Sequence, residues 1–298
     1  MLKKATGQTL IGCMREAKDL VDSSTPDTFR LAQTSYIYSD DGTQLAALAE
    51  SEDATYLSYE DIPADVVNAF VSVEDRTFWN NSGVDYKGIL RVCVNYVKTK
   101  GQVAEGASTI TQQLLKNNVF TNWTNESTQV ERFTRKLQEQ FLAVEIEKKI
   151  GDKNVILENY LNTINLGAGA YGVQAAARQY FNKDVWDLNL SECATLAGIT
   201  QAPTKYNPIE NPKENAKRRK EVLDHMLDQG YITQEQYDDA INDDVYTRIQ
   251  EAQASNTQSS SKTYSYFEDE LTKQVINDLM NIKGYTKTQA QNLLYSGG

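Results

Sequence analysis

An acidic side chain interrupts an apolar helical stripe in the first third of the chain. The pattern predicts a helix over residues 64–79, beginning after Pro63. At about 100° per residue, the face that carries Glu74 is otherwise apolar, and its other members are Val67, Phe70, Val71 and Phe78. A carboxylate among apolar groups loses hydration and binds a proton more readily, which suits a general base. The alternative is a glutamate at the edge of the core, neutralised by a cation from another helix. This helix alone does not decide between the two.

A second helix, predicted over residues 108–119, carries groups that can hold an anion. Ser108 is the expected N-cap, and Ile110 and Leu114 form the apolar face. The opposite face presents a hydroxyl, two amides and an ammonium group, from Thr109, Gln112, Gln113 and Lys116. Backbone N–H groups at a helix N-terminus bind anions, so this face is a candidate phosphate site. The other interpretation is the solvated face of an ordinary amphipathic helix.

A third helix, predicted over residues 126–149, brings two cations beside a carboxylate. Its expected core face consists of Phe133, Leu137, Phe141 and Val144. Its expected outer face consists of Arg132, Lys136, Glu139 and Ala143. Arg135 and Lys136 precede Glu139 by four and three residues, so both can pair with it. A surface ion-pair stripe of little energetic value explains this helix equally well when it is considered alone.

The rest of the chain predicts a mainly α-helical protein with a small β-rich segment near its start. Residues 35–38 and 45–48 flank Asp41-Gly42, which is a hairpin turn signal. Further helices are expected over 85–98, 152–163, 170–181, 190–200, 213–229, 233–242, 265–282 and 286–294. The polar stretch Gln250–Thr263 is typical of a linker.

Composition argues against several classes of protein. The 298 residues include 41 acidic and 30 basic side chains, and a net charge of −11 does not suit a general nucleic-acid binder. Cys13, Cys93 and Cys193 form no disulfide or zinc-binding pattern, and the single histidine, His225, excludes a multi-histidine metal site. No run of about 18 apolar residues predicts a membrane-spanning helix. Gly167–Gly172 matches a dinucleotide-binding glycine pattern, but it follows a helical segment instead of a strand, so no such site is expected.

Taken in order, the polar helices resemble the motif series of the peptidoglycan glycosyltransferases, glycosyltransferase family 51. This is the domain with which class A penicillin-binding proteins polymerise glycan. The five matching stretches are Glu74–Phe78 with Gly83 and Asp85, Gly106–Asn117, Arg135–Glu139, Ile156–Asn162, and Ala194–Gly198 with Pro203 and Tyr206–Pro208. The resemblance covers about residues 60–240.

The resemblance implies a lysozyme-like, mainly α-helical glycosyltransferase domain with two lobes at residues 61–245. A post-anchor segment with a β-hairpin would precede it at 1–60. A linker and the start of a truncated transpeptidase domain would follow at 246–298. The implied enzyme is an inverting transferase. The 4-hydroxyl of lipid II attacks the anomeric carbon of a growing lipid-linked glycan, a β-1,4 bond forms, and undecaprenyl pyrophosphate leaves.

The resemblance also implies residue roles by motif position. Glu74 is the general base, and Glu139 is the second carboxylate of the catalytic site. The cations expected to stabilise the leaving pyrophosphate are Lys116, Arg135 and Lys136. The other expected substrate-binding residues are Asp75, Phe78, Ser108, Thr109, Gln113 and Asn162. No metal-ligand set and no required cofactor are implied, although stimulation by Mg or Mn is compatible with pyrophosphate chemistry.

Two departures from the family pattern stand out. Many family members have histidine where this chain has Asn81, so a hydrogen bond near the first motif is expected to differ. The N-terminal membrane anchor of the family is absent from this sequence, which leads us to expect that the chain begins just after it. The expected location is the extracytoplasmic face of the bacterial cell membrane. The expected partners are lipid II, lipid-linked glycan, the membrane surface and other cell-wall synthesis proteins.

Two other functions remain as alternatives. A glycan-cleaving muramidase shares the lysozyme-like fold and a catalytic glutamate, but it does not need Lys116 and Lys136 to hold a pyrophosphate. An inactive scaffold in a wall-synthesis complex is the second alternative, and the presence of both Glu74 and Glu139 argues against it.

Overall fold

The computed structural model describes residues 18, 21–22, 35–42, 44–48, 56–99, 106–118, 128–259 and 266–283. The helix expected over 286–294 and most of the segment 1–60 lie outside these described residues.

The described chain is mainly helical, as the sequence predicts. Strands β1 (Ser35–Tyr38) and β2 (Gln44–Leu48) pair antiparallel. The helices are α2 (Ala64–Glu74), α3 (Tyr86–Lys98), α4 (Ile110–Asn118), α5 (Gln129–Ile150), α6 (Lys153–Thr163), α7 (Val173–Phe181), α8 (Leu190–Ala197), α9 (Pro212–Asp228), α10 (Gln234–Asn242), α11 (Val245–Ser259) and α12 (Tyr266–Lys283). Short 3-10 turns lie at Tyr59–Asp61 and Val185–Asp187.

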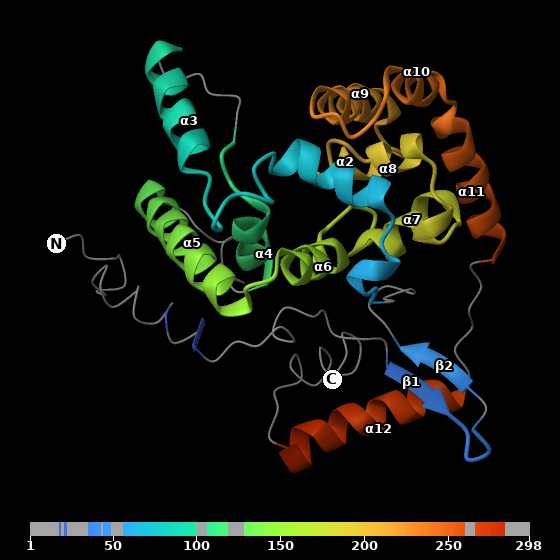
Figure 1. The fold of residues 1–298 in the computed structure, drawn as a ribbon. Coiled ribbons are helices and arrows are strands. Elements are labelled where there is room, and N and C mark those ends of the chain that lie inside the picture. Colours follow the sequence, from blue (N-terminus) through green and yellow to red (C-terminus); the bar gives the residue numbers. More distant parts are fainter. Residues whose placement is uncertain are drawn as a thin grey trace.

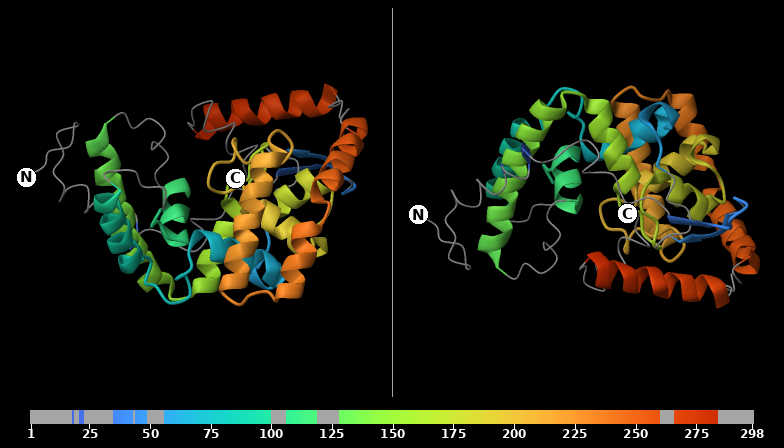
Figure 2. Two further views of the ribbon diagram at one scale, coloured as in Figure 1. Left: turned by 90° about the horizontal axis from the view of Figure 1, so that it is seen from above. Right: turned by 90° about the horizontal axis from the view of Figure 1, so that it is seen from below.

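The helices form a rounded body with an arm at one side (Figure 1). In the body, α2 packs on α8 and α9, and α11 packs on α7. The arm contains α3, α4 and α5, and α4 contacts both α5 and α6, which joins the arm to the body. The views from above and below keep the arm at the same side and show α12 outside the body (Figure 2). Because α2 runs toward the arm, its last residue, Glu74, lies at the junction of the two parts.

Helix α2 ends five residues earlier than the sequence predicts. It begins after Pro63 as expected, but Asp75 leaves helical geometry at φ −154° and the chain turns through residues 76–80. The Asp75 carboxylate accepts hydrogen bonds from the backbone and the hydroxyl of Thr77, so it stabilises this turn in place of another helical turn. Phe78 is fully buried as expected, but from the turn and not from the helical stripe.

The buried face of α5 differs from the prediction. Leu142, Ala143 and Ile146 are fully buried together with Glu139, whereas the expected core residues Leu137, Phe141 and Val144 are only partly buried. The side chain of Phe133, the fourth expected core residue, lies outside the described part. This face of α5 is buried because Gly83 packs closely against it. The φ of Gly83 is +88°, and a Cβ added to it would lie 2.5 Å from the carbonyl oxygen of Ala143.

The predicted linker Gln250–Thr263 is helical as far as Ser259, so that prediction is wrong for this part. Ala252 is buried, and the side-chain amide of Gln253 donates to the carbonyl oxygen of Gln179 on α7 at 2.7 Å. A polar sequence is helical here because Ala252 and the Gln253 amide on one side of it contact the rest of the body. Within the described ranges, no helix combines the length and the apolar composition that crossing a bilayer requires.

Candidate active site

Glu74, the last residue of α2, receives polar contacts from three other parts of the chain. The Gln113 side-chain amide on α4 donates to its Oε2 at 2.8 Å. The Thr200 hydroxyl, in the turn that follows α8, donates to its Oε1. Arg218 on α9 brings Nη2 within 3.9 Å of the same oxygen. The Glu74 side chain is 12% exposed, so these donors replace most of its water. The carboxylate is therefore held by polar neighbours as well as lying on an apolar helix.

The orientation of the Gln113 amide is set from α6. The Tyr160 hydroxyl donates to Oε1 of Gln113 at 3.1 Å, which turns the amide nitrogen toward Glu74. Burial raises the pKa of Tyr160 well above its ordinary value, and the charges of Glu74 and Asp75 raise it further. The phenol therefore stays protonated and acts as the donor. The Gln113 amide thus contacts both Glu74 and Tyr160, and its expected contact with the substrate stays a prediction.

The N-terminus of α4 is capped from within the protein. Thr109 is the N-cap in place of the expected Ser108: the backbone N–H of Gln112 donates to its hydroxyl, and its own N–H donates to the Gln112 side chain. The backbone N–H of Ile110 donates to Asp75 at 3.2 Å. The predicted anion position at this helix start is therefore partly filled by the protein's own carboxylate.

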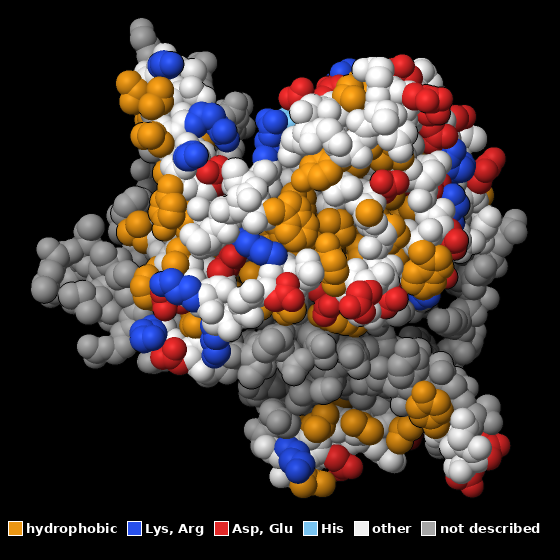
Figure 3. Space-filling model, in the orientation of Figure 1, with side chains coloured by type: hydrophobic (Ala, Val, Ile, Leu, Met, Phe, Trp, Pro, Cys, Tyr) orange, Lys and Arg blue, Asp and Glu red, His pale blue; other side chains and the backbone are white. Residues whose placement is uncertain are grey.

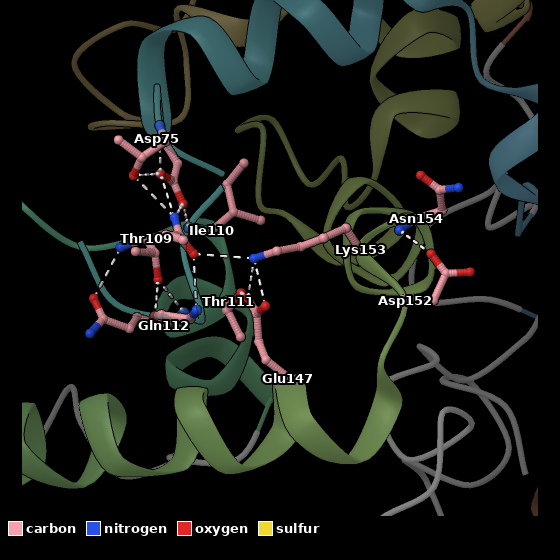
Figure 4. A network of polar contacts seen from close by, with 12 residues as sticks. Asp75, Thr109, Ile110, Thr111, Gln112, Glu147, Asp152, Lys153 and Asn154 are labelled. Carbon is pink, nitrogen blue, oxygen red and sulfur yellow. Dashed lines mark hydrogen bonds and ion pairs between the residues drawn. The ribbon is translucent and has the colours of Figure 1, made fainter. Parts of the chain in front are cut away.

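Asp75 is the centre of a buried polar network that fixes the first motif on α4 (Figure 4). Burial raises the pKa of Asp75, and hydrogen bonds from Asn81, Ile110 and Thr77 oppose that rise. The Asn81 amide donates to both carboxylate oxygens at 3.0 Å, and its own oxygen accepts from Lys153 at 3.1 Å. Asn81 thus makes one link that joins Asp75 to α6, at the position where family members often have histidine.

The same network continues to α5. Lys153 pairs with Glu147 at 2.6 Å, and the Thr111 hydroxyl on α4 donates to Glu147 at 2.5 Å. The Lys153 ammonium also lies 4.6 Å from the centre of the Phe78 ring. Asp75 is therefore fixed to the start of α4, and Phe78 lies against Lys153 of α6.

A second carboxylate, Glu139 on α5, holds two cations. Its side chain is 1% exposed; Arg135 donates to Oε1, and Lys136 donates to Oε2 at 2.8 Å. These pairings confirm the spacing argument from the sequence. The Lys136 side chain remains 43% exposed, and its ammonium also donates to the Ser108 hydroxyl at 2.9 Å. The buried glutamate thus positions a cation that solvent, or an anionic ligand, can reach.

Helix α4 joins the two carboxylate centres. Gln113 contacts Glu74, and Ser108, two residues before the helix, contacts Lys136. Lys116 lies one turn beyond Gln113 on α4 and is partly exposed. The geometry therefore brings the predicted base and the predicted cations to one short helix.

Asn162 is engaged elsewhere. Its amide donates to the carbonyl oxygen of Leu57 at 2.8 Å, and its side-chain oxygen accepts from the N–H of Leu57 at 2.8 Å. It also donates to the carbonyl oxygen of Glu158. Asn162 therefore fastens the segment before α2 to α6, and its expected role as a substrate ligand stays a prediction.

Sequence reasoning missed Thr200 and Arg218. Both lie more than a hundred residues from Glu74, so helical periodicity carries no information about their contact. The available signal was the pair Arg218-Arg219 in a predicted helix with apolar neighbours, because buried arginines need partners. Among the described residues, no three His, Cys, Asp or Glu side chains gather in a way that could hold a metal ion.

Comparisons with known proteins agree on one family. A model of the family described as "Transglycosylase" matches residues 41–227. Penicillin-binding protein 1A of Clostridium perfringens is 40% identical over 276 residues, which cover 90% of this chain and 32% of that protein. The Aquifex aeolicus protein of the same name is 45% identical over 226 residues, covering 76% of this chain and 30% of that one.

Among solved structures, the crystal structure of penicillin-binding protein 1A from Haemophilus influenzae matches 72% of this chain and 21% of that chain. Its sequence identity is 26% and its TM-score is 0.38. The chain spans about a third of the length of the curated relatives it matches.

Proposed function

Because the chain belongs to the transglycosylase family, we propose that it is a peptidoglycan glycosyltransferase that polymerises lipid II into β-1,4-linked glycan. The observation that carries the proposal is that one short stretch, Ser108–Gln113, contacts both carboxylate centres. Gln113 donates to Glu74, and Lys136, which pairs with Glu139, donates to Ser108. A transfer from a pyrophosphate donor needs a base for the attacking hydroxyl and a cation for the leaving group, and both are available here.

In the proposed reaction, Glu74 accepts the proton of the acceptor's 4-hydroxyl as that oxygen bonds to the anomeric carbon. The bond from the anomeric carbon to the pyrophosphate breaks, and undecaprenyl pyrophosphate leaves with the electron pair. Attack opposite to the leaving group inverts the anomeric centre. Negative charge grows on the pyrophosphate, and Lys136, Arg135 and Lys116 stabilise it, because preorganised cations act most strongly where charge develops.

Glu139 contributes by position in this proposal. Its burial and its two ion pairs leave no exposed oxygen for a proton-transfer role, so it fixes the cations instead. Asp75 holds the start of α4. Ser108 and Thr109 hold the preceding loop against α5 and Gly83. A divalent cation such as Mg or Mn, if it stimulates the reaction, would be bound mainly by the pyrophosphate.

A muramidase is the competing enzyme. A muramidase hydrolyses glycan and needs no cation beside the base. In this chain, the buried Glu139 holds two cations, Arg135 and Lys136. An inactive scaffold would not retain Glu74 with donors on both of its oxygens. Both observations favour the transferase.

The substrate's lipid tail implies a membrane surface, and α3 offers a face for it. Four large apolar side chains recur along one side of α3 with exposures of 64%, 66%, 42% and 78%: Tyr86, Leu90, Val94 and Val97. Lys87, Arg91 and Lys98 lie beside them. Figure 3 shows hydrophobic and basic side chains side by side along the arm. We propose that this face of α3 lies on the extracytoplasmic membrane surface. Other cell-wall synthesis proteins would contact the chain at the same surface.

The same proposal includes the architecture. The arm and the body would be the two lobes of a lysozyme-like domain, with the substrate groove at their junction. The body includes α11, which packs on α7, so the domain would extend past the expected boundary at residue 245 to Ser259.

The test is incubation of the purified chain, in detergent, with labelled lipid II. Wild type is expected to form polymer, and Glu74→Gln is expected to lose activity by roughly a hundredfold or more, because the base is removed. Glu145→Gln is the matched control, since Glu145 pairs only with exposed Lys148 on the outer side of α5. Cleavage of preformed glycan without polymerisation would support the muramidase. The absence of both activities would support the scaffold.

A further inference from the structure

The Thr200 hydroxyl lies between Glu74 and a backbone carbonyl. Its oxygen is hydrogen-bonded to Oε1 of Glu74, and it lies 2.8 Å from the carbonyl oxygen of Ala197, the last residue of α8. A hydroxyl has one hydrogen and two lone pairs, so it can donate to only one of these acceptors at a time. The two contacts therefore describe two orientations of one O–H group.

These two orientations match the two protonation states of Glu74. When Glu74 is ionised, Thr200 donates to it. When Glu74 is a neutral acid, Thr200 can turn its hydrogen to Ala197 and offer a lone pair to the acid's O–H. In both states each part-buried donor of this group has an acceptor. A donor without an acceptor would cost desolvation free energy.

Gln113 cannot adjust in this way. Its amide nitrogen carries only donor hydrogens, and Tyr160 fixes which end of the amide faces Glu74. Oε2 of Glu74 therefore has a permanent hydrogen-bond donor, and Oε1 has an adjustable one. This asymmetry makes Oε1 the better place for a proton to arrive and leave. The Arg218 guanidinium on α9, with Nη2 3.9 Å from Oε1, lies beyond hydrogen-bond distance, and its charge favours the ionised form of the carboxylate in wild type and in the Thr200 variants alike.

We propose that Thr200 is a positioning residue for proton transfer, an inference that rests on the proposed role of Glu74 as general base. As the acceptor oxygen bonds to the anomeric carbon and the pyrophosphate departs with its electron pair, the acceptor's proton moves to Oε1 of Glu74. The Thr200 hydroxyl turns to the Ala197 carbonyl and accepts from the new acid. Loss of that proton to water returns both groups to their starting state.

A purely structural role predicts something different. Threonine hydroxyls often bond to a carbonyl one turn earlier, and Thr200 could simply close the end of α8 in that way. Its removal would then lower stability or rate evenly across pH. A positioning role instead changes the pH at which the base works, because hydrogen bonds to the ionised form favour that form.

The experiment measures kcat/KM for lipid II polymerisation against pH for Thr200→Val and Thr200→Ser, with melting temperatures recorded for both. Removal of the hydroxyl in Thr200→Val is expected to move the acid limb of the profile upward by about one pH unit. Thr200→Ser keeps the hydroxyl and is expected to follow wild type. Thr195→Val is the matched control, because Thr195 is fully buried in α8 and its hydroxyl donates to the Ser191 carbonyl, away from Glu74.

The outcomes separate this inference from the proposed function. If Glu74→Gln abolishes polymerisation while Thr200→Val keeps the wild-type acid limb, the inference on Thr200 is wrong and the base assignment stands. If Glu74→Gln polymerises normally, the assignment of Glu74 as general base fails, and with it the inference on Thr200. If wild type does not polymerise lipid II, the proposed function itself fails. A Thr200→Ser profile that moves with Thr200→Val would also overturn the inference, since the serine hydroxyl can make both contacts.

Discussion

Replacement of Glu139 by glutamine tests whether this carboxylate serves to hold cations. Each of its two oxygens accepts from a different cation, Arg135 at Oε1 and Lys136 at Oε2. Glutamine has one acceptor oxygen and an amide nitrogen that carries only donors, so one cation must face an N–H group. Because Glu139 is 1% exposed, water cannot fill the missing role.

The magnitude follows from the exposure of the partners. Breaking a buried ion pair costs about 3–5 kcal/mol. Arg135 is 12% exposed and belongs in that range, whereas Lys136 is 43% exposed and contributes closer to a surface pair. We expect Glu139→Gln to lower the free energy of unfolding by about 3 kcal/mol, which is about 6–12 °C in Tm. The control Glu145→Gln breaks only an exposed pair and is expected to lose less than about 1 kcal/mol.

A double variant makes the test sharper. Adding Lys136→Met to Glu139→Gln removes one stranded cation, so part of the lost stability is expected to return in urea unfolding measured by circular dichroism. Polymerisation is not expected to return, because the cation for the pyrophosphate is gone. The reasoning would be refuted if Glu139→Gln unfolded with the control, or if the double variant regained polymerisation together with stability.

Three further predictions concern other parts of the chain. Asn162→Ala strands both backbone groups of Leu57 and is expected to cost about 1–3 kcal/mol in urea unfolding; a raised KM with unchanged stability would instead favour substrate binding. Burial, with the charge of two nearby arginines, lowers the pKa of His225 below 6.5. Its neutral form therefore stabilises the fold above pH 6.5, and this contribution is lost as pH falls through the lowered pKa. The imidazole should titrate below 6.5 by NMR, and wild type should lose more stability than His225→Gln between pH 7.5 and pH 5. Leu90→Glu on α3 is expected to weaken binding to anionic vesicles in flotation assays, whereas Ile282→Glu, which also alters an exposed apolar residue, is not.

Local signals account for what the sequence predicts well. The pairing of Glu139 with Arg135 and Lys136 depends only on positions within one helix, and α5 forms as expected. Helix starts also follow local chemistry: Asp152 caps α6, and Asn189 makes a capping box with Glu192 at α8. In each case the deciding groups are two to four residues apart, so a short stretch of sequence contains both partners.

The errors arise where a distant partner decides. Polarity suggested that the Glu139 face of α5 was exposed, but α4 and the Gly83 turn supply the contacts that bury it. Polarity likewise suggested a linker at Gln250, where α7 supplies the packing surface for α11. Periodicity assigns residues to the faces of a helix, but it does not say which face meets another element. The Thr200 contact to Glu74 is out of reach for the same reason.

Helix α4 explains why these long-range contacts matter for the chemistry. It has nine residues, too few to be stable alone, so its position depends on its contacts. Asp75 holds its first N–H group, Thr111 ties it to Glu147 on α5, and Gln113 ties it to Tyr160 on α6. The helix that spaces the base from the cations is thus fixed from three sides. A change in any one of these contacts alters the distance between Glu74 and Lys136 without touching either, so catalysis should be more sensitive to them than stability is.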